Sequence, residues 1–414
     1  MNNIFRFRRS TFIVSVIIAS ILILTKCIGK QEENKVLVKQ PDISEFAGSD
    51  KCLSCHKNIH EQFVQTAHHK TTVAALKDNF KGSIQKGHNS YAYNPNQTIA
   101  IEERNNEFYQ VIYVNGKERK ALRIDAIIGS GTRGQSFLNW QGNFLYQLPL
   151  TYYSFARQWG SSPGFLPNKI QLNRPITSRC LECHATTAYK LSGPDQVHEA
   201  FDHDRLIMGV ECEKCHGPAA RHVAYQEQNP NDRQGKFIIN PAHFTRQQSL
   251  DMCALCHAGS MKKLNPSFTF RPGDQLMDYF KVDTISSEAA GYGIVDVHGN
   301  KYGLLRASKC FRMSQLTCTT CHNTHEKEQG KLALFSQRCM NCHNTEHGSF
   351  CKLNTSVVSL KDNCIDCHMP SKPSQSIVLF TQGENRLVAA KFRTHFITVY
   401  REESKKYLEM KSKK

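Results

Sequence analysis

Seven copies of one short pattern, Cys-x-x-Cys-His, contain fourteen of the 17 cysteines in this chain of 414 residues. Two thiols three positions apart with an imidazole directly after them can attach a porphyrin through two thioether bonds and ligate its iron. Zinc ribbons also use Cys-x-x-Cys pairs, but zinc does not demand the adjacent histidine. The pattern therefore predicts seven covalently bound c-type haems (iron protoporphyrin), at sites numbered 1 to 7 in chain order. The attaching cysteines are Cys52 and Cys55, Cys180 and Cys183, Cys212 and Cys215, Cys253 and Cys256, Cys318 and Cys321, Cys339 and Cys342, and Cys364 and Cys367, and the proximal iron ligands are His56, His184, His216, His257, His322, His343 and His368.

The chain has 19 histidines, so twelve remain after the motifs, enough to give every iron a second imidazole. Bis-histidine ligation would keep the reduction potentials low, whereas one of the nine methionines as ligand would raise them. Any single candidate is also explained as an ordinary surface or core histidine. The predicted distal ligands are His68 or His69 after site 1, His203, His222, His298, His325, His347 and His395, with His222 and His325 the strongest.

Three cysteines lie outside the motifs, namely Cys27, Cys310 and Cys351. In an oxidising compartment the last two could form a disulfide that holds sites 5 and 6 together. The alternative is two unrelated thiols, and the sequence does not decide between them.

The N-terminus has the pattern of an export signal, with Arg6, Arg8 and Arg9 before an apolar run at 11–25. Such a run is shorter than the roughly 20 residues of a membrane-spanning helix. We expect residues 1–27 to be a lipoprotein-like signal peptide with Cys27 as the lipidated residue, although Lys26 departs from the usual small residue; an uncleaved N-terminal anchor is the alternative. Residues 28–48 would be a tether. The protein is expected to be exported, membrane-attached and on the periplasmic side.

The rest of the chain divides by its motifs. The predicted segments are 49–90 with site 1, a haem-free β-rich insert at 91–175, 176–260 with sites 2–4, a linker at 261–305, 306–370 with sites 5–7, and a C-terminal segment with a basic tail at 371–414. Apolar and polar residues alternate after Tyr91, with turn pairs at Asn105-Asn106 and Asn115-Gly116, which predicts a small β-meander.

A glycine-rich run, Gly129 to Gly134, matches the G-x-G-x-x-G pattern of dinucleotide-binding loops. The acid that would hold a ribose is missing, because no Asp or Glu occurs between Asp125 and Glu182. A simple turn is the favoured interpretation. The same acid-free stretch is basic and aromatic, with Arg133 among its cations, and could bind an oxyanion, a quinone or an acidic partner. We favour packing of its aromatic rings on haems and pairing of its cations with haem propionates.

The formal charge of +17 would fit a polyanion-binding protein. Seven haems with two propionates each would add about −14, leaving a net charge of about +3. We therefore expect no nucleic-acid partner.

Several runs resemble the cytochrome c-554 type of bacterial periplasmic multihaem cytochrome, namely GVECEKCHGPAARH, LTCTTCHNTHE and NCIDCHMP. More distantly they resemble pentahaem nitrite reductase and the octahaem hydroxylamine and tetrathionate enzymes. The resemblance implies a mostly α fold with long loops, wound around stacked haems, plus a small β-rich insert at about 91–150. It supports His222 and His325 as distal ligands. It does not imply catalysis, since the Cys-x-x-Cys-Lys haem of nitrite reductases is missing.

These features predict a heptahaem electron carrier of a periplasmic or cell-envelope respiratory chain. Its partners would be a quinol-side donor and a terminal reductase or outer-surface acceptor, and the membrane through its N-terminal lipid or anchor. No catalytic residue is needed. The alternative is a reductase of a nitrogen or sulfur oxyanion, with one haem iron open to a pocket.

Overall fold

A computed structural model describes residues 42–191, 198–282, 299–346, 348, 350–353, 359–380 and 387–413. The predicted signal peptide with Cys27 and most of the tether lie outside these residues, as do the candidate ligands His298 and His347. No helix in the described part is long and apolar enough to cross a membrane.

The described part of the chain is as much β as α, with 30% helix, 28% strand and six sheets, so the expectation of a mostly helical fold was wrong. That expectation came from the resemblance and overlooked alternating apolar residues outside the predicted insert. The hairpin of β12 (Ala185–Lys190) and β13 (Phe201–Met208) lies among the haem motifs, and the hairpin of β16 (Ser371–Phe380) and β17 (Leu387–Arg393) follows the last one. In β17 the alternation that buries one face of a strand is visible, with Lys391 exposed between the buried Ala390 and Phe392.

The predicted meander is a four-stranded antiparallel sheet in the order β2-β3-β4-β5. In the β3–β4 and β4–β5 turns both central residues have positive φ, with 52° and 63° at Asn105 and Asn106, and 49° and 72° at Asn115 and Gly116. Asn and Gly tolerate this conformation, which matches the right-handed twist of the flanking strands. The strands are β2 (Ser90–Asn94), β3 (Gln97–Arg104), β4 (Glu107–Val114) and β5 (Lys117–Arg123).

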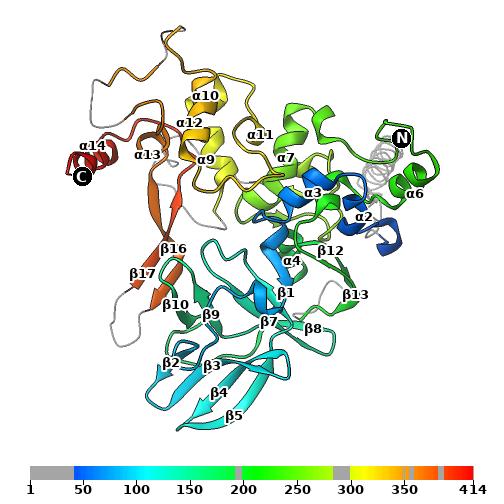
Figure 1. Cartoon of the computed structure of the whole chain (residues 1–414), viewed down its shortest axis with the longest axis vertical. Coiled ribbons are helices and arrows are strands. Elements are labelled where there is room, and N and C mark those ends of the chain that lie inside the picture. Colours follow the sequence, from blue (N-terminus) through cyan, green and yellow to red (C-terminus); the bar gives the residue numbers. More distant parts are fainter. Residues whose placement is uncertain are drawn as a thin grey trace, which may run out of the picture. The chain divides into compact units, whose positions relative to one another are not determined.

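A second haem-free sheet has five strands in the order β1-β6-β7-β8-β11 and lies beside the meander (Figure 1). Ile99 of the meander and Phe137 of the second sheet are both fully buried in one apolar core, which Trp159 also joins. The strands are β1 (Thr72–Ala74), β6 (Ala126–Ile128), β7 (Ser136–Gln141), β8 (Phe144–Gln147) and β11 (Arg174–Pro175), and the separate β9 (Leu150–Tyr153) and β10 (Gln158–Ser161) form a hairpin.

Most of the helices are short and belong to the half of the chain that carries the haem motifs (Figure 1). The motif helices are α2 (Ser49–Leu53), α4 (Ser178–His184), α5 (Cys212–His216), α7 (Arg246–His257), α11 (Cys318–Cys321), α12 (Leu332–Met340) and α13 (Ile365–His368). The others are α3 (Lys57–Phe63), α6 (Ala220–Gln228), α9 (Lys301–Ala307), α10 (Lys309–Arg312) and α14 (Arg401–Ser412). The 3-10 turns are η1 (Ile43–Glu45), η2 (His69–Thr71), η3 (Lys77–Asn79), η4 (Pro241–His243) and η5 (Leu276–Asp278), and β14 (Lys262–Lys263) pairs with β15 (Phe280–Lys281).

The β16–β17 hairpin joins the haem-motif half to the haem-free sheets. It starts directly after the site 7 motif, and β16 packs against β10 (Figure 1). Ala390 and Phe392 of β17 are buried against Phe155, which follows β9. The two halves of the described chain are therefore in direct contact through this hairpin.

Candidate functional site

The haem motifs share one local geometry. In site 1 the His56 N–H donates to the Cys52 carbonyl at 2.8 Å, and the same bond from the histidine to the first cysteine measures 3.0, 2.9 and 3.1 Å in sites 5, 6 and 7. Residues joined by this i→i−4 bond lie on the same face of a helical turn. Each of these motifs therefore presents its first thiol and its imidazole to the same side, as covalent attachment of one porphyrin requires.

Three motif histidines face a second imidazole from elsewhere in the chain. The ring centres are 6.1 Å apart for His216 and His325, 6.3 Å for His257 and His68, and 6.3 Å for His322 and His395. With metal–nitrogen bonds of about 2.0 Å and ring centres about 1.15 Å behind the ligating nitrogens, an iron between two imidazoles sets the centres about 6.3 Å apart. The three pairs thus fit bis-histidine haem ligation at sites 3, 4 and 5.

Burial favours the neutral form, which ligates a metal, for five of the imidazoles in these pairs. Burial lowers the pKa of His257 to about 3 and that of His395 to about 4, helped in both cases by the charge of Lys301. Burial likewise lowers the pKa values of His68, His322 and His325. A neutral imidazole keeps a lone pair for iron at the pH of a cell envelope.

Backbone carbonyls fix the orientation of several rings. The Nδ1 atom of His216 lies 2.9 Å from the Ile239 carbonyl oxygen, and the Nδ1 atom of His368 lies 3.0 Å from that of Thr398. A metal-bound histidine commonly donates its other ring N–H to such an acceptor. The arrangement leaves Nε2 for iron at sites 3 and 7. At site 2, the Nδ1 atom of His184 lies 3.0 Å from the Thr71 hydroxyl.

The other predicted distal ligands are placed differently. His222 shows the same ligand-like arrangement, with Nδ1 2.8 Å from the Lys236 carbonyl oxygen, but its ring does not face a motif histidine among the described contacts. His69 has its Nδ1 atom 2.7 Å from the Glu211 carboxylate. The assignment of His222 to an iron stays a prediction.

His203 is occupied by contacts within the β-rich half. Its ring stacks on Trp140 with centres 3.9 Å apart, and its Nε2 atom lies 2.9 Å from the Gly142 carbonyl oxygen. Ligation of an iron through Nε2 would require this contact to break. Its role as a ligand also stays a prediction.

Motifs that are distant in the sequence touch through their thiols. Four pairs lie within hydrogen-bonding reach, and they connect site 1 with 3, site 2 with 4, site 4 with 5 and site 6 with 7: Cys52 with Cys212, Cys183 with Cys256, Cys253 with Cys318, and Cys339 with Cys364.

Site 3 also lies near site 4, and site 5 near site 6, although none of these thiol contacts joins the motifs of either pair. The pKa of Cys253 is raised by its contact with Cys318, by burial and also by the nearby Cys215 of site 3. The pKa of Cys339 is raised by Cys364, by burial and also by the nearby Cys321 of site 5. Sites 1, 3, 4, 5, 6 and 7 therefore form a continuous series of neighbours, with site 2 beside site 4.

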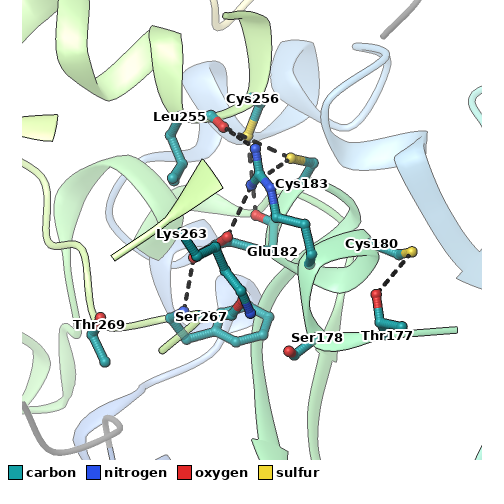
Figure 2. Close-up of polar contacts among 12 residues, drawn as sticks. Thr177, Ser178, Cys180, Glu182, Cys183, Leu255, Cys256, Lys263, Ser267 and Thr269 are labelled. Atoms are coloured by element: carbon teal, nitrogen blue, oxygen red, sulfur yellow. Dashed lines mark hydrogen bonds and ion pairs between the residues drawn. The ribbon is translucent and has the colours of Figure 1, made fainter. Parts of the chain in front are cut away.

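Figure 2 shows the contact between sites 2 and 4. The Cys183 thiol lies 3.9 Å from the Leu255 carbonyl oxygen, and the Cys256 thiol lies 4.0 Å from that of Glu182. Arg179 reaches from α4 to the same Leu255 carbonyl oxygen at 3.1 Å and to the Glu182 carboxylate at 2.9 Å. The two motif helices are thus joined by a polar cluster.

Carboxylates at the variable positions of three motifs anchor them, which the sequence analysis missed. Glu182, 1% exposed, accepts the Phe268 N–H at 2.9 Å. Glu213, 3% exposed, accepts the N–H groups of Ala47, Gly48 and Ala219 at 2.8, 2.9 and 2.8 Å. Asp366 pairs with Arg393. An acid between the two cysteines was the available signal, and its value became visible only with the long-range partners.

The structure also bears on the two cysteines outside the motifs and on the glycine-rich run. Cys310 and Cys351 are both free thiols in the structure, which gives no support to the disulfide hypothesis. The glycine-rich run is the turn between β6 and β7, with positive φ at Gly129 and Gly131, and no helix follows it. The interpretation as a turn rather than a dinucleotide loop is confirmed.

Comparisons with known proteins agree with this geometry. Residues 167–217, which contain sites 2 and 3, match the family model for cytochrome c554 and c-prime. The multiheme cytochrome MtrA of Shewanella baltica (strain OS185) is 25% identical over 195 residues, 46% of this chain and 51% of that protein. The chain thus spans about half the length of this curated relative.

Among solved structures, the outer cell wall cytochrome OcwA superposes with a TM-score of 0.52 at 16% identity, covering 87% of this chain and 81% of that one. An undecaheme cytochrome from the S-layer of Carboxydothermus ferrireducens covers 87% of this chain and 53% of its own, with a TM-score of 0.39 and 16% identity. The site and the fold define a haem protein of the c type. The chain is a multihaem c-type cytochrome with covalently bound haem.

Proposed function

We propose that this cytochrome carries seven haems and transfers electrons in the cell envelope, along the series of neighbouring sites 1-3-4-5-6-7 with site 2 as a branch at site 4. The observation that carries the proposal is the continuous series of neighbouring motifs described above, four of whose links are thiol contacts. The haems supply one-electron exchange at their irons. The chain's part is to attach them next to one another, to close irons with buried neutral imidazoles and to exclude water.

Site 1, at one end of the series, and site 6, next to the other end, lie at the surface. At site 1, Cys55 and His56 are exposed, and at site 6, Cys342 and His343 are exposed, whereas the motif residues of sites 3 and 4 are partly buried. Electrons can therefore enter at site 1 and leave at site 6 without a partner reaching the centre of the series. A quinol-side donor and a terminal reductase or outer-surface acceptor are the proposed partners. The structural similarity to OcwA, an outer cell wall cytochrome, supports a location outside the cytoplasm. Membrane attachment through Cys27 or an N-terminal anchor remains part of the proposal.

The test combines a haem count with ligand-binding spectroscopy on the full-length holoprotein. A pyridine haemochrome assay should give seven haems per chain. The oxidised spectrum should be low-spin and insensitive to cyanide, because a carrier needs no open iron. A count below six would refute the heptahaem assignment.

A high-spin fraction with a cyanide-induced shift would favour the alternative, a reductase of a nitrogen or sulfur oxyanion. The facing pairs described for sites 3, 4 and 5 account for three irons, so an open iron would have to belong to one of the other sites.

A further inference from the structure

The glycine-rich turn of the haem-free half reaches the segments that carry the ligands of site 5. The Thr132 hydroxyl lies 3.5 Å from the side-chain oxygen of Gln329, seven residues after His322. The Arg133 guanidinium lies 5.2 Å above the ring of Phe392, three residues before His395. His322 and His395 are the facing pair of site 5, so the turn touches both segments that supply that pair.

The turn is fixed in this position by close backbone packing. A Cβ atom at Gly134 would come within 2.7 Å of the Tyr152 carbonyl oxygen, and one at Gly131 would come within 2.7 Å of the Lys81 side chain. The Arg133 carbonyl accepts the Ser154 N–H at 3.0 Å. Arg133 is therefore held at the boundary between the two halves by a rigid loop.

The guanidinium of Arg133 carries a positive charge, and its Nε atom is buried. Among the described residues, the buried Nε atom of Arg133 has no hydrogen-bond partner, and neither has the buried hydroxyl of Ser154. Burial lowers the pKa of Arg133, and the neighbouring Arg393 lowers it further. A buried donor beside a second cation is costly unless an anion compensates it.

Among the described residues, no carboxylate is paired with Arg133. Asp366 is paired with Arg393, and Glu328 with Arg338. The stretch between Asp125 and Glu182, which forms much of the haem-free half, contains no acidic residue. A group outside the polypeptide would therefore supply the anion, and the haem at site 5, whose ligand-bearing segments the turn contacts, would carry two propionate carboxylates.

We propose that Arg133 binds a propionate of the haem at site 5, with the Ser154 hydroxyl as a second donor. The inference rests on the proposed function only in requiring a haem at Cys318, Cys321 and His322. It gives the haem-free half a role, which is to set the reduction potential of a central haem in the series. A guanidinium beside the propionate favours the reduced haem, because reduction adds negative charge.

The experiment is a spectropotentiometric titration of the full-length holoprotein and three variants. R133Q removes the charge at nearly constant size, R133K keeps the charge but not the planar fork, and R119Q removes an exposed arginine of β5 that has no ion-pair partner among the described residues. We expect R133Q to lower the reduction equilibrium constant of one haem at least about tenfold, which is ~59 mV for one electron. R133K should change this equilibrium constant less than R133Q does, and R119Q should change it less than twofold.

A structure of the holoprotein identifies the haem, with Arg133 nitrogens within hydrogen-bonding distance of a propionate oxygen at site 5. A change of less than twofold in every reduction equilibrium constant of R133Q would overturn the proposal. A holoprotein structure in which the Arg133 guanidinium binds the propionate of another site would also overturn it. Reduction potentials that depend on added sulfate or nitrite in the wild type, but not in R133Q, would overturn it as well, because they would show that Arg133 binds an exchangeable oxyanion instead. The haem count of the wild type tests the heptahaem function separately, because none of these outcomes changes it.

Discussion

Replacing His68 by alanine should open one haem iron to carbon monoxide, whereas replacing its neighbour His69 should not. The His68 ring faces His257 of site 4 at 6.3 Å, so an iron at the midpoint is about 3.15 Å from each ring centre, which is one ligand bond plus the ring radius. His69 directs its Nδ1 atom to Glu211 at 2.7 Å instead. The two adjacent histidines therefore form a matched pair of test and control.

The expected magnitude follows from stoichiometry. Loss of the His68 imidazole leaves the iron of site 4 with a single nitrogen ligand from the protein, and a five-coordinate ferrous iron binds carbon monoxide. One site among the proposed seven corresponds to about 14% of the total haem. The oxidised protein should gain a high-spin component of the same fraction. His69→Ala should show neither change beyond the wild-type level.

The assay is a carbon monoxide titration of dithionite-reduced protein, with the difference spectrum normalised to the haemochrome count of each variant. The count must stay equal to that of the wild type, since a lost haem would lower the total rather than open an iron. Carbon monoxide binding in His69→Ala but not in His68→Ala would refute the assignment of the pair. Binding in neither variant would refute the use of ring spacing as evidence for ligation.

Two further results are expected. Glu213→Gln should destabilise the protein by roughly 2–3 kcal/mol, because the amide cannot keep all three charge-assisted backbone hydrogen bonds; urea denaturation measures this, the exposed Glu61→Gln is the control, and an equal effect of both would contradict it. Electron paramagnetic resonance of the oxidised protein should separate site 4 from sites 3 and 5, because the ring planes of His68 and His257 cross at 63°, against 24° and 27° in the other two pairs. Three indistinguishable low-spin signals would argue against these orientations.

Features that depend on neighbouring residues could be predicted from the sequence, whereas features that depend on distant segments of the chain could not. The Asn-rich turns of the meander and the turn at Gly129 depend on residues within a few positions of each other, and the structure agrees with them. The distal ligands depend on chain segments that meet only in the fold. His325 lies three residues after His322 of site 5, yet its ring faces His216 of site 3. Spacing alone could nominate His325 as a ligand but could not say which iron it closes.

The fold class failed for a related reason. Short motif helices and a resemblance to helical cytochromes outweighed the strand signals, although the alternation in β17 was present in the sequence. Hairpins such as β12–β13 are interrupted by register shifts, which break the two-residue period that identifies a strand. The anchoring role of Glu213 was equally hidden, since its backbone partners at Ala47 and Gly48 are 166 and 165 residues away.

The three facing pairs connect the order of the chain to the assembly of the haems. His68 follows the site 1 motif and faces site 4, His325 follows the site 5 motif and faces site 3, and His395 follows the site 7 motif and faces site 5. Each of these ligands is carried by a segment that begins at another motif. The C-terminal segment has no motif of its own, yet it supplies His395. A chain that ends after Pro370 should therefore still attach every haem through its cysteines but leave the iron of site 5 open to carbon monoxide, and a truncated chain whose irons all stay closed would show that another residue ligates site 5.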